Sequence, residues 1–156
     1  MTVRGTRILL AASLAASACG YGLSTRWQGR GGVERVEVLD LENLSTEPGL
    51  GAAVTGALRT ALARRGAAGP GGARLVGEVR AQPPVPSSAG SATWRITLEV
   101  RARLLRGDEA VAEGTFTRAA DYLGGADPVE SEGRRTLALR RLADELAGEI
   151  VTAFER

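Results

Sequence analysis

The chain has 156 residues, 20 of them basic and 18 acidic, with no histidine and a single cysteine, Cys19. Without a histidine or a second cysteine it cannot assemble a Ser-His-Asp or Cys-His catalytic group, and a zinc site would need carboxylates alone. We therefore expect no enzyme activity, no cofactor and no metal site. A carboxylate pair remains conceivable, but the candidates lie at predicted element ends, where turn and cap roles explain them: Asp40, Glu42, Glu47, Asp121 and Asp127.

The N-terminus has the pattern of a bacterial lipoprotein signal peptide. Arg4 and Arg7 precede an apolar run, and small residues at 16–18 lead to Cys19. The run has about 11 residues, too few for the roughly 20 that a membrane-spanning helix needs. We expect residues 1–18 to be removed and Cys19 to be acylated. The alternative is an ordinary signal peptide, whose cleavage after residue 16 or 18 would leave Cys19 as a free thiol.

Acylation of Cys19 also predicts the location of the protein. Several buried acyl chains, at roughly 0.8 kcal/mol per methylene, anchor a protein durably. Gly20 stands where the inner-membrane retention signal of enteric lipoproteins has Asp, so we expect the periplasmic side of the outer membrane. Residues 19–32 are rich in Gly and Arg without periodicity and are predicted to form a lipidated tether. Residues 33–156 have the size of a single domain.

The excess of basic residues belongs to the signal peptide. Loss of Arg4 and Arg7 leaves 18 basic and 18 acidic residues. Lysine is absent, and the abundance of Arg, Ala and Gly is typical of a GC-rich genome. The arginine content therefore does not indicate nucleic-acid binding, and we expect no nucleic-acid partner.

The first half of the domain predicts a strand and a helix. Aliphatic and charged residues alternate over 33–41, which favours a strand, and Glu42-Asn43 follows as a turn. Residues 45–48, with Pro48 in the first turn, predict a helix start. Leu50, Val54, Leu58 and Leu62 form one helical stripe, which ends at Gly66 in a position suited to a left-handed cap.

The second half predicts three strands and a second helix. A strand at 74–81 precedes a Pro/Ser loop at 82–91, and strands at 93–105 and 110–122 flank a hairpin turn at 106–109. Asp127-Pro128-Val129-Glu130 predicts a capped helix start. Its buried stripe runs nearly to the C-terminus and comprises Leu139, Leu142, Ala143, Leu146, Ile150 and Phe154.

The order strand, helix, strand, strand, strand, helix predicts a two-layer α+β domain. Both helices should pack on one face of a four-stranded mixed sheet, with a crossover through the first helix and antiparallel hairpins elsewhere. The strand at 93–105 alternates most cleanly, with apolar residues on one face and charged residues on the open one. The candidate residues for binding a ligand or partner are Arg95, Arg101, Arg103 and Arg118. The alternative is that these arginines are solvated and paired with Glu99 and its neighbours on adjacent strands.

Several segments together resemble a known family. They are Ala18-Cys19-Gly20-Tyr21, the strand at 36–41 with Glu42-Asn43-Leu44-Ser45-Thr46-Glu47-Pro48-Gly49-Leu50, Val54-Thr55-Gly56-Ala57-Leu58-Arg59, and Arg64-Arg65-Gly66. In these the chain resembles the LptE family of lipopolysaccharide-assembly lipoproteins. It departs mildly, since the family usually has Phe at the position of Leu41 and often Thr at that of Ser45.

The resemblance implies a function and a set of partners. It implies a non-enzymatic lipoprotein seated inside the outer-membrane β-barrel LptD, acting as plug and assembly factor and assisting delivery of lipopolysaccharide to the outer leaflet. The open-face arginines would then contact lumen carboxylates or lipid A phosphates, both of which guanidinium binds bidentately. The Pro/Ser loop would reach into the barrel, or would simply lack order.

Two other functions fit the pattern less well. An outer-membrane regulator of a peptidoglycan synthase, of the LpoB type, needs a long tether, whereas about 13 residues, spanning roughly 45 Å, separate Cys19 from Val33. A lipid or sugar carrier would need an apolar pocket, and a chain with 4% aromatic residues uses its apolar residues in helix–sheet packing.

Overall fold

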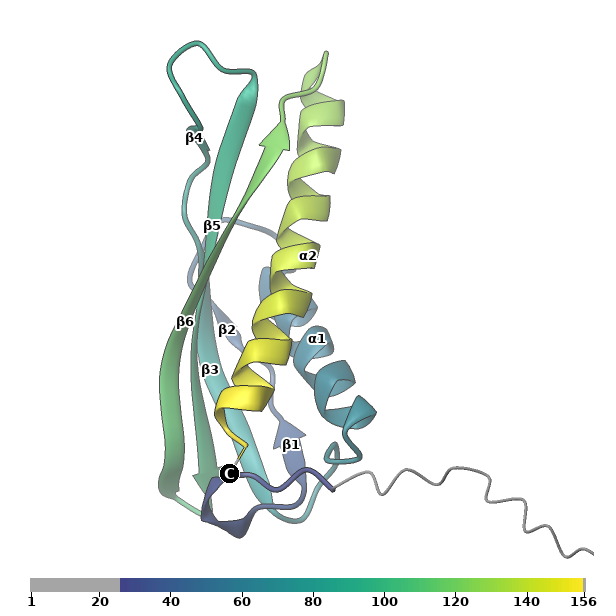
Figure 1. Ribbon diagram of the computed structural model, residues 1–156, viewed down its shortest axis with the longest axis vertical. Coiled ribbons are helices and arrows are strands. Elements are labelled where there is room, and N and C mark those ends of the chain that lie inside the picture. Colours follow the sequence, from purple (N-terminus) through teal and green to yellow (C-terminus); the bar gives the residue numbers. More distant parts are fainter. Residues whose placement is uncertain (1–25, 156) are drawn as a thin grey trace, which may run out of the picture.

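The computed structural model describes residues 26–155, which form an elongated two-layer body with both helices on one face of a mixed sheet (Figure 1). The helical elements are η1 (Arg30–Gly32), α1 (Leu50–Arg64) and α2 (Pro128–Ala153). The strands are β1 (Val36–Val38), β2 (Glu42–Asn43), β3 (Ala73–Ala81), β4 (Val85–Pro86), β5 (Thr93–Arg106) and β6 (Glu109–Leu123). The predicted α+β architecture is confirmed.

The sheet has six strands, so the prediction of four strands is wrong in number. The path runs β1-β3-β5-β4, while β2 pairs with β3 and β6 pairs with β5. β1 and β2 follow each other along one edge of β3, and β4 continues the line of β3 along β5. The predicted strand at 33–41 is observed only as β1, and Glu42-Asn43, predicted as a turn, forms β2, with the register on β3 shifted by one residue between them. The other additional strand, β4, lies in the predicted Pro/Ser loop at 82–91.

The first helix begins later than predicted. Gly49, with φ 71°, is its N-terminal flanking residue, and Pro48 lies outside the helix rather than in its first turn. The preceding segment is held as a turn, because the Asn43 amide donates to the Glu47 carbonyl at 2.7 Å. The predicted end is confirmed, since Gly66 has φ 68° and follows the last helical turn.

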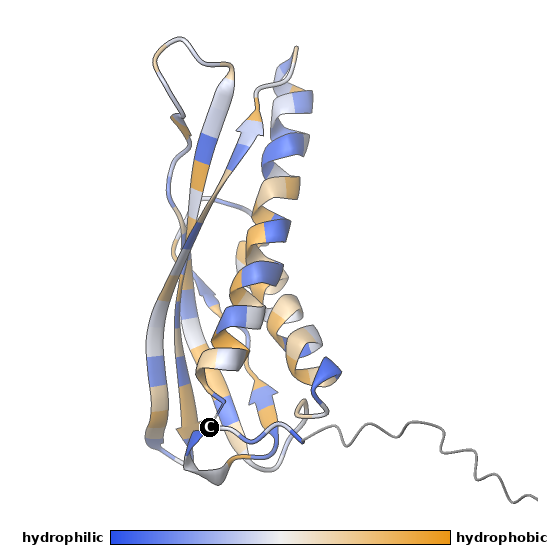
Figure 2. Cartoon of the chain, in the orientation of Figure 1, coloured by the Kyte–Doolittle hydropathy of each residue, from blue (hydrophilic) through white to orange (hydrophobic). Residues whose placement is uncertain are grey.

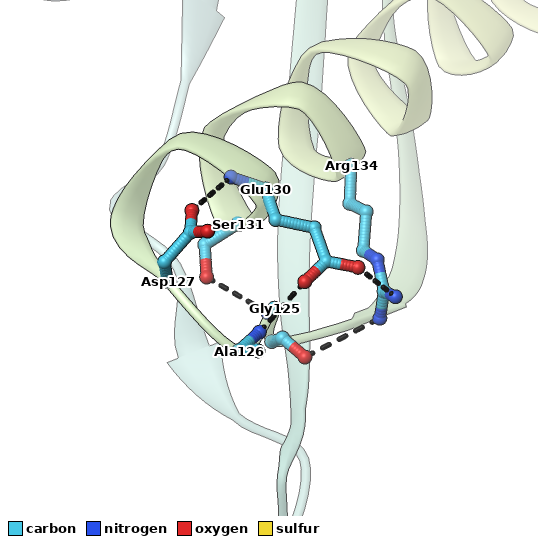
Figure 3. Close-up of polar contacts among 7 residues, drawn as sticks. Gly125, Ala126, Asp127, Glu130, Ser131 and Arg134 are labelled. Atoms are coloured by element: carbon cyan, nitrogen blue, oxygen red, sulfur yellow. Dashed lines mark hydrogen bonds and ion pairs between the residues drawn. The ribbon is translucent and has the colours of Figure 1, made fainter.

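The start of α2 confirms the predicted cap (Figure 3). The Glu130 N–H donates to the Asp127 carboxylate at 2.8 Å, and the Glu130 carboxylate accepts from the Ala126 N–H at 2.8 Å. Arg134 reaches back to both Glu130 and the Gly124 carbonyl. These bonds satisfy backbone groups that every helix start leaves unpaired, so the position of α2 on the sheet is defined at its first turn.

The core lies between the helices and the sheet, where apolar and polar residues alternate along the strands (Figure 2). Leu58, Leu62, Leu142, Leu146, Ile150, Ile96, Leu98 and Leu104 are each at most 1% exposed. Full burial of one such side chain stabilises the fold by about 1.5–3 kcal/mol. Because β5 supplies only its even-numbered side chains to this core, its odd-numbered ones lie on the open face.

Part of the predicted tether packs against the domain. Trp27 is 2% exposed, and its indole N–H donates to the Val151 carbonyl at 3.1 Å. The Arg30 N–H donates to the Phe154 carbonyl at 2.9 Å, so the chain enters the body beside its C-terminus. The packed body thus includes Trp27, which precedes the predicted domain start at residue 33. The predicted signal peptide and the predicted acylation site, Cys19, lie outside the described residues. Within 26–155 no helix is both long and apolar enough to cross a membrane.

Candidate functional site

The open face of the sheet carries charged residues in opposite-sign pairs across neighbouring strands. The strand register places five such pairs side by side: Glu37 with Arg74, Glu78 with Arg101, Arg80 with Glu99, Arg103 with Glu113, and Arg95 with Asp121. Opposite charges at directly paired positions favour this register, whereas like charges would oppose it. The open face is therefore a charged surface of alternating sign.

Arg95 is already engaged within the sheet. Its guanidinium makes two bonds to the Asp121 carboxylate, at 2.8 and 3.0 Å, and Ser87 adds a third at 3.2 Å. The hydrogen bond from Arg95 lowers the pKa of Asp121, and the same bond raises the pKa of Arg95. Of the five pairs, this is the one that closes to an ion pair within the described part of the chain. Arg95 thus has a structural partner near the loop that leads to β5.

Arg101 and Arg103 have no such partner. Neither side chain forms a hydrogen bond or an ion pair with any residue of 26–155. Of the three open-face arginines, Arg95 alone has the carboxylate partner on an adjacent strand that the alternative expected. Arg101 and Arg103 both line a concavity of about 700 Å³ on the open face. Its other lining residues are Leu39, Asp40, Glu42, Val76, Gly77, Glu78, Glu113, Gly114 and Thr115. Arg101 and Arg103 lie about 20 and about 26 Å along β5 from Arg95, so the open-face arginines predicted from the sequence are in two separate places.

The charge of this concavity is mixed rather than basic. Its lining combines two arginines with four carboxylates, and Glu42 and Glu78 are direct neighbours in the register of β2 and β3. A phosphate placed on Arg101 would lie close to these carboxylates and be repelled by them. A polar protein surface that carries both signs of charge complements the concavity better.

Arg118 lies on the opposite face from the other three candidate arginines. It pairs in register with Leu98, a core residue, and its guanidinium binds the Glu149 carboxylate of α2 at 2.8 Å. Arg118 therefore connects the sheet to the helix layer. The alternation within β6 carried a signal for this, because Phe116, Arg118 and Ala120 share one face of a strand.

An ion pair that the sequence analysis missed connects distant segments. Glu47, 9% exposed as a residue, pairs with Arg135 of α2, which also contacts Glu132 at 3.4 Å. The hydrogen bond to Glu47 raises the pKa of Arg135, and burial raises the pKa of the adjacent Tyr122. No local pattern predicted this pair, because its partners are 88 residues apart.

Three of the other carboxylates singled out in the sequence also have structural contacts, while Glu42 lines the concavity. Asp40 pairs with Arg59 at 3.0 Å, Asp121 with Arg95, and Asp127 caps α2. Among residues 26–155 there is no group of three or more side chains suited to hold a metal ion.

A comparison with protein families shows to which family the chain belongs. The family model for lipopolysaccharide-assembly proteins of the LptE type matches residues 33–154, most of the chain. The chain belongs to the LptE family. Within this LptE-family protein the match spans every strand and helix from β1 to α2. No curated protein sequence matches the chain significantly.

Solved structures share the fold of this LptE-family protein. A protein from Caulobacter crescentus CB15 that is assigned to the lipoproteins is 20% identical to this chain, with a TM-score of 0.58. The match covers 74% of this chain and 87% of that protein. The subunit of the PelC dodecamer from Paraburkholderia phytofirmans is 14% identical, with a TM-score of 0.56, and the match covers 82% of this chain and 93% of that subunit. A minor lipoprotein from Acinetobacter baumannii is 16% identical, with TM-score 0.51, covering 77% and 90%. At these identities the likeness extends to the fold alone.

Proposed function

We propose that this protein is an outer-membrane lipoprotein, anchored through acylated Cys19, that plugs and assists assembly of an LptD-type β-barrel and takes part in lipopolysaccharide transport to the outer leaflet. Membership of the LptE family is the observation that carries the proposal. Lipoproteins among the proteins of the same fold support the anchored state. The role is one of binding and assembly, without catalysis.

The open face supports a barrel as the partner. The interior of a large outer-membrane barrel is polar, so a plug must present polar groups to it. Arg101, Arg103 and Glu113 are charged, exposed and without an ion-pair partner among the described residues, which leaves them available for groups of a barrel wall. The four carboxylates of the concavity make direct binding of lipid A phosphates there the weaker alternative.

The position of the anchor supports a partner in the same membrane. Cys19 precedes Arg26 by seven residues, which span at most about 25 Å when fully extended. Because Trp27 is already packed in the body, this short segment keeps the domain close to the membrane surface. A synthase deep in the periplasm, as the regulator hypothesis requires, would lie beyond that reach.

Affinity purification of the full-length protein from its native envelope tests the proposal. We expect a large outer-membrane β-barrel to be recovered in about a one-to-one ratio, with lipopolysaccharide quantified in the same complex. The matched control is the same purification from cells that express the Cys19→Ser variant. Recovery of a peptidoglycan synthase in place of a barrel would contradict the proposal and support the regulator function.

A further inference from the structure

The outer edge of β6 is a row of unpaired backbone groups. β6 pairs with β5 on one side and with no other strand among the described residues. The Gly124 N–H donates to the Ala92 carbonyl at 2.7 Å, which defines the alternation of the ladder. The backbone N–H and C=O groups of the even-numbered residues of β6 therefore form the hydrogen bonds with β5. The residues whose N–H and C=O groups point away from the sheet are Glu113, Thr115, Thr117, Ala119 and Asp121.

This edge lacks the usual protection against strand pairing. Natural sheets block long edges with proline, lysine, bulges or a covering segment. Between Glu113 and Asp121 there is no proline and no lysine, and the one register shift in the ladder lies just outside this stretch, opposite the residues that precede Ala112. Arg118, the only basic residue in the stretch, is bonded to Glu149. The five edge residues are all exposed.

We propose that the β6 edge from Glu113 to Asp121 is a strand-addition site that binds an extended segment of the barrel partner. This inference rests on the proposed function and names how that partner is held. The added segment forms main-chain hydrogen bonds with the five outward residues. Its side chain opposite Glu113 is basic, because that carboxylate has no partner among the described residues, and those opposite Thr115 and Thr117 are small or polar.

A single extended segment needs less room at this edge than a second copy of this chain. α2 lies over β6, where Arg118 binds Glu149 at 2.8 Å. Paired strands lie about 4.8 Å apart, whereas packed helices need about 8–10 Å between their axes. Pairing of two β6 edges would require the two copies of α2 to pack against each other as well. An extended segment without a covering helix has no such requirement.

Proline scanning of the outward positions tests the site. Thr117→Pro removes an N–H that points away from β5, so the β5–β6 ladder keeps its hydrogen bonds, while the ring obstructs an added strand. Thr117→Ala removes the side chain and keeps the N–H, and is the matched control. We expect Thr117→Pro to reduce recovery of the barrel from native envelopes by about tenfold or more, and Thr117→Ala to leave it near the wild-type level.

The outcomes separate this inference from the proposed function. Undiminished barrel recovery by a folded Thr117→Pro variant overturns strand addition and leaves the proposed function standing. Failure of the wild-type protein to recover a barrel overturns both. If Thr117→Pro does not fold, hydrogen exchange of the wild-type complex decides. We expect the amides of 115, 117 and 119 to exchange about tenfold or more slowly than in the free protein, and unchanged exchange would overturn the inference.

Discussion

Glu47 and Arg135 form an ion pair that ties the turn before α1 to the first half of α2, although they are 88 residues apart in the chain. Their side chains are 11% and 26% exposed, and the Arg135 Nε atom is buried without a hydrogen-bond partner. The pair thus holds the two helices in register with each other. Loss of Arg135 is the costly change, because the Glu47 carboxylate would remain largely buried without its counter-charge.

Replacement of Arg135 by Ala is therefore expected to destabilise the protein by about 2–4 kcal/mol, since Glu47 would lose its counter-charge. Arg141→Ala is the control, because Arg141 pairs with Glu145 while 77% of its own side chain is exposed. That change should cost less than about 0.5 kcal/mol. Urea unfolding of both variants measures the difference, and equal small losses would show that the Glu47–Arg135 pair contributes little.

Burial of Trp27 predicts that the stable body begins before residue 33. Trp27→Ala should destabilise the fold by about 3–5 kcal/mol, from the loss of apolar burial and the cavity it leaves. Trp94→Ala is the control, since Trp94 is 37% exposed. Its cost should be clearly smaller in the same thermal unfolding experiment. A Trp27 variant as stable as wild type would place the segment around it outside the cooperative unit.

The cap of α2 should make stability depend on acid pH. The Ala126 N–H, and then the charge of Arg134, hold the pKa of Glu130 below its usual 4.5. The folded state therefore binds this proton less readily than the unfolded state. The resulting stabilisation is present above pH about 4.5 and is lost as the pH falls through the lower folded pKa.

Glu130→Gln should accordingly flatten the acid limb of the stability curve. Urea midpoints recorded between about pH 2.5 and 7 measure this, with Glu145→Gln as control because Glu145 is an exposed carboxylate further along the same helix. Identical acid slopes for wild type and Glu130→Gln would contradict the assigned role of the cap.

Because the side chains of Arg101 and Arg103 have no partner among the described residues, their replacement should affect binding of the barrel. Arg101→Glu together with Arg103→Glu should reduce barrel recovery by about tenfold, because both residues are free on the concave open face. Thermal stability should change little. Arg140→Glu together with Arg141→Glu, on the exposed side of α2, makes the same change in net charge and is the control. Unchanged recovery by the double variant would leave the open face as a merely solvated surface.

Acylation at Cys19 predicts a simple change of location. Cys19→Ser should abolish incorporation of labelled palmitate and shift the protein from the membrane fraction to the soluble fraction, since no acyl chain would then be attached. Fractionation with an antibody against the folded body measures both forms. A Cys19→Ser protein that stays with the membrane would contradict anchoring by this residue alone.

The sequence predicted the parts of the fold that arise from local interactions. The stripe of α1, the Asp127–Glu130 cap and the alternation of β5 depend on residues within one or two turns or strand steps, so they can be read from neighbours along the chain. The predicted start of α1 was wrong because Asn43 and Glu47 hold the preceding residues in a turn. The strand number was wrong because the predicted turn at Glu42-Asn43 and the predicted loop at 82–91 each contain two residues that pair with a strand distant in the sequence, as β2 and β4.

By itself the sequence determined the α+β order, the charged open face of β5 and the resemblance to the LptE family, since each is a pattern of residue types along the chain. The tertiary structure decided which arginines are free. Arg95 is paired with Asp121, Arg118 is turned to Glu149, and Arg101 and Arg103 are exposed without an ion-pair partner among the described residues. Those differences depend on strand register and on the place of α2, and both are set by contacts between residues far apart in the chain.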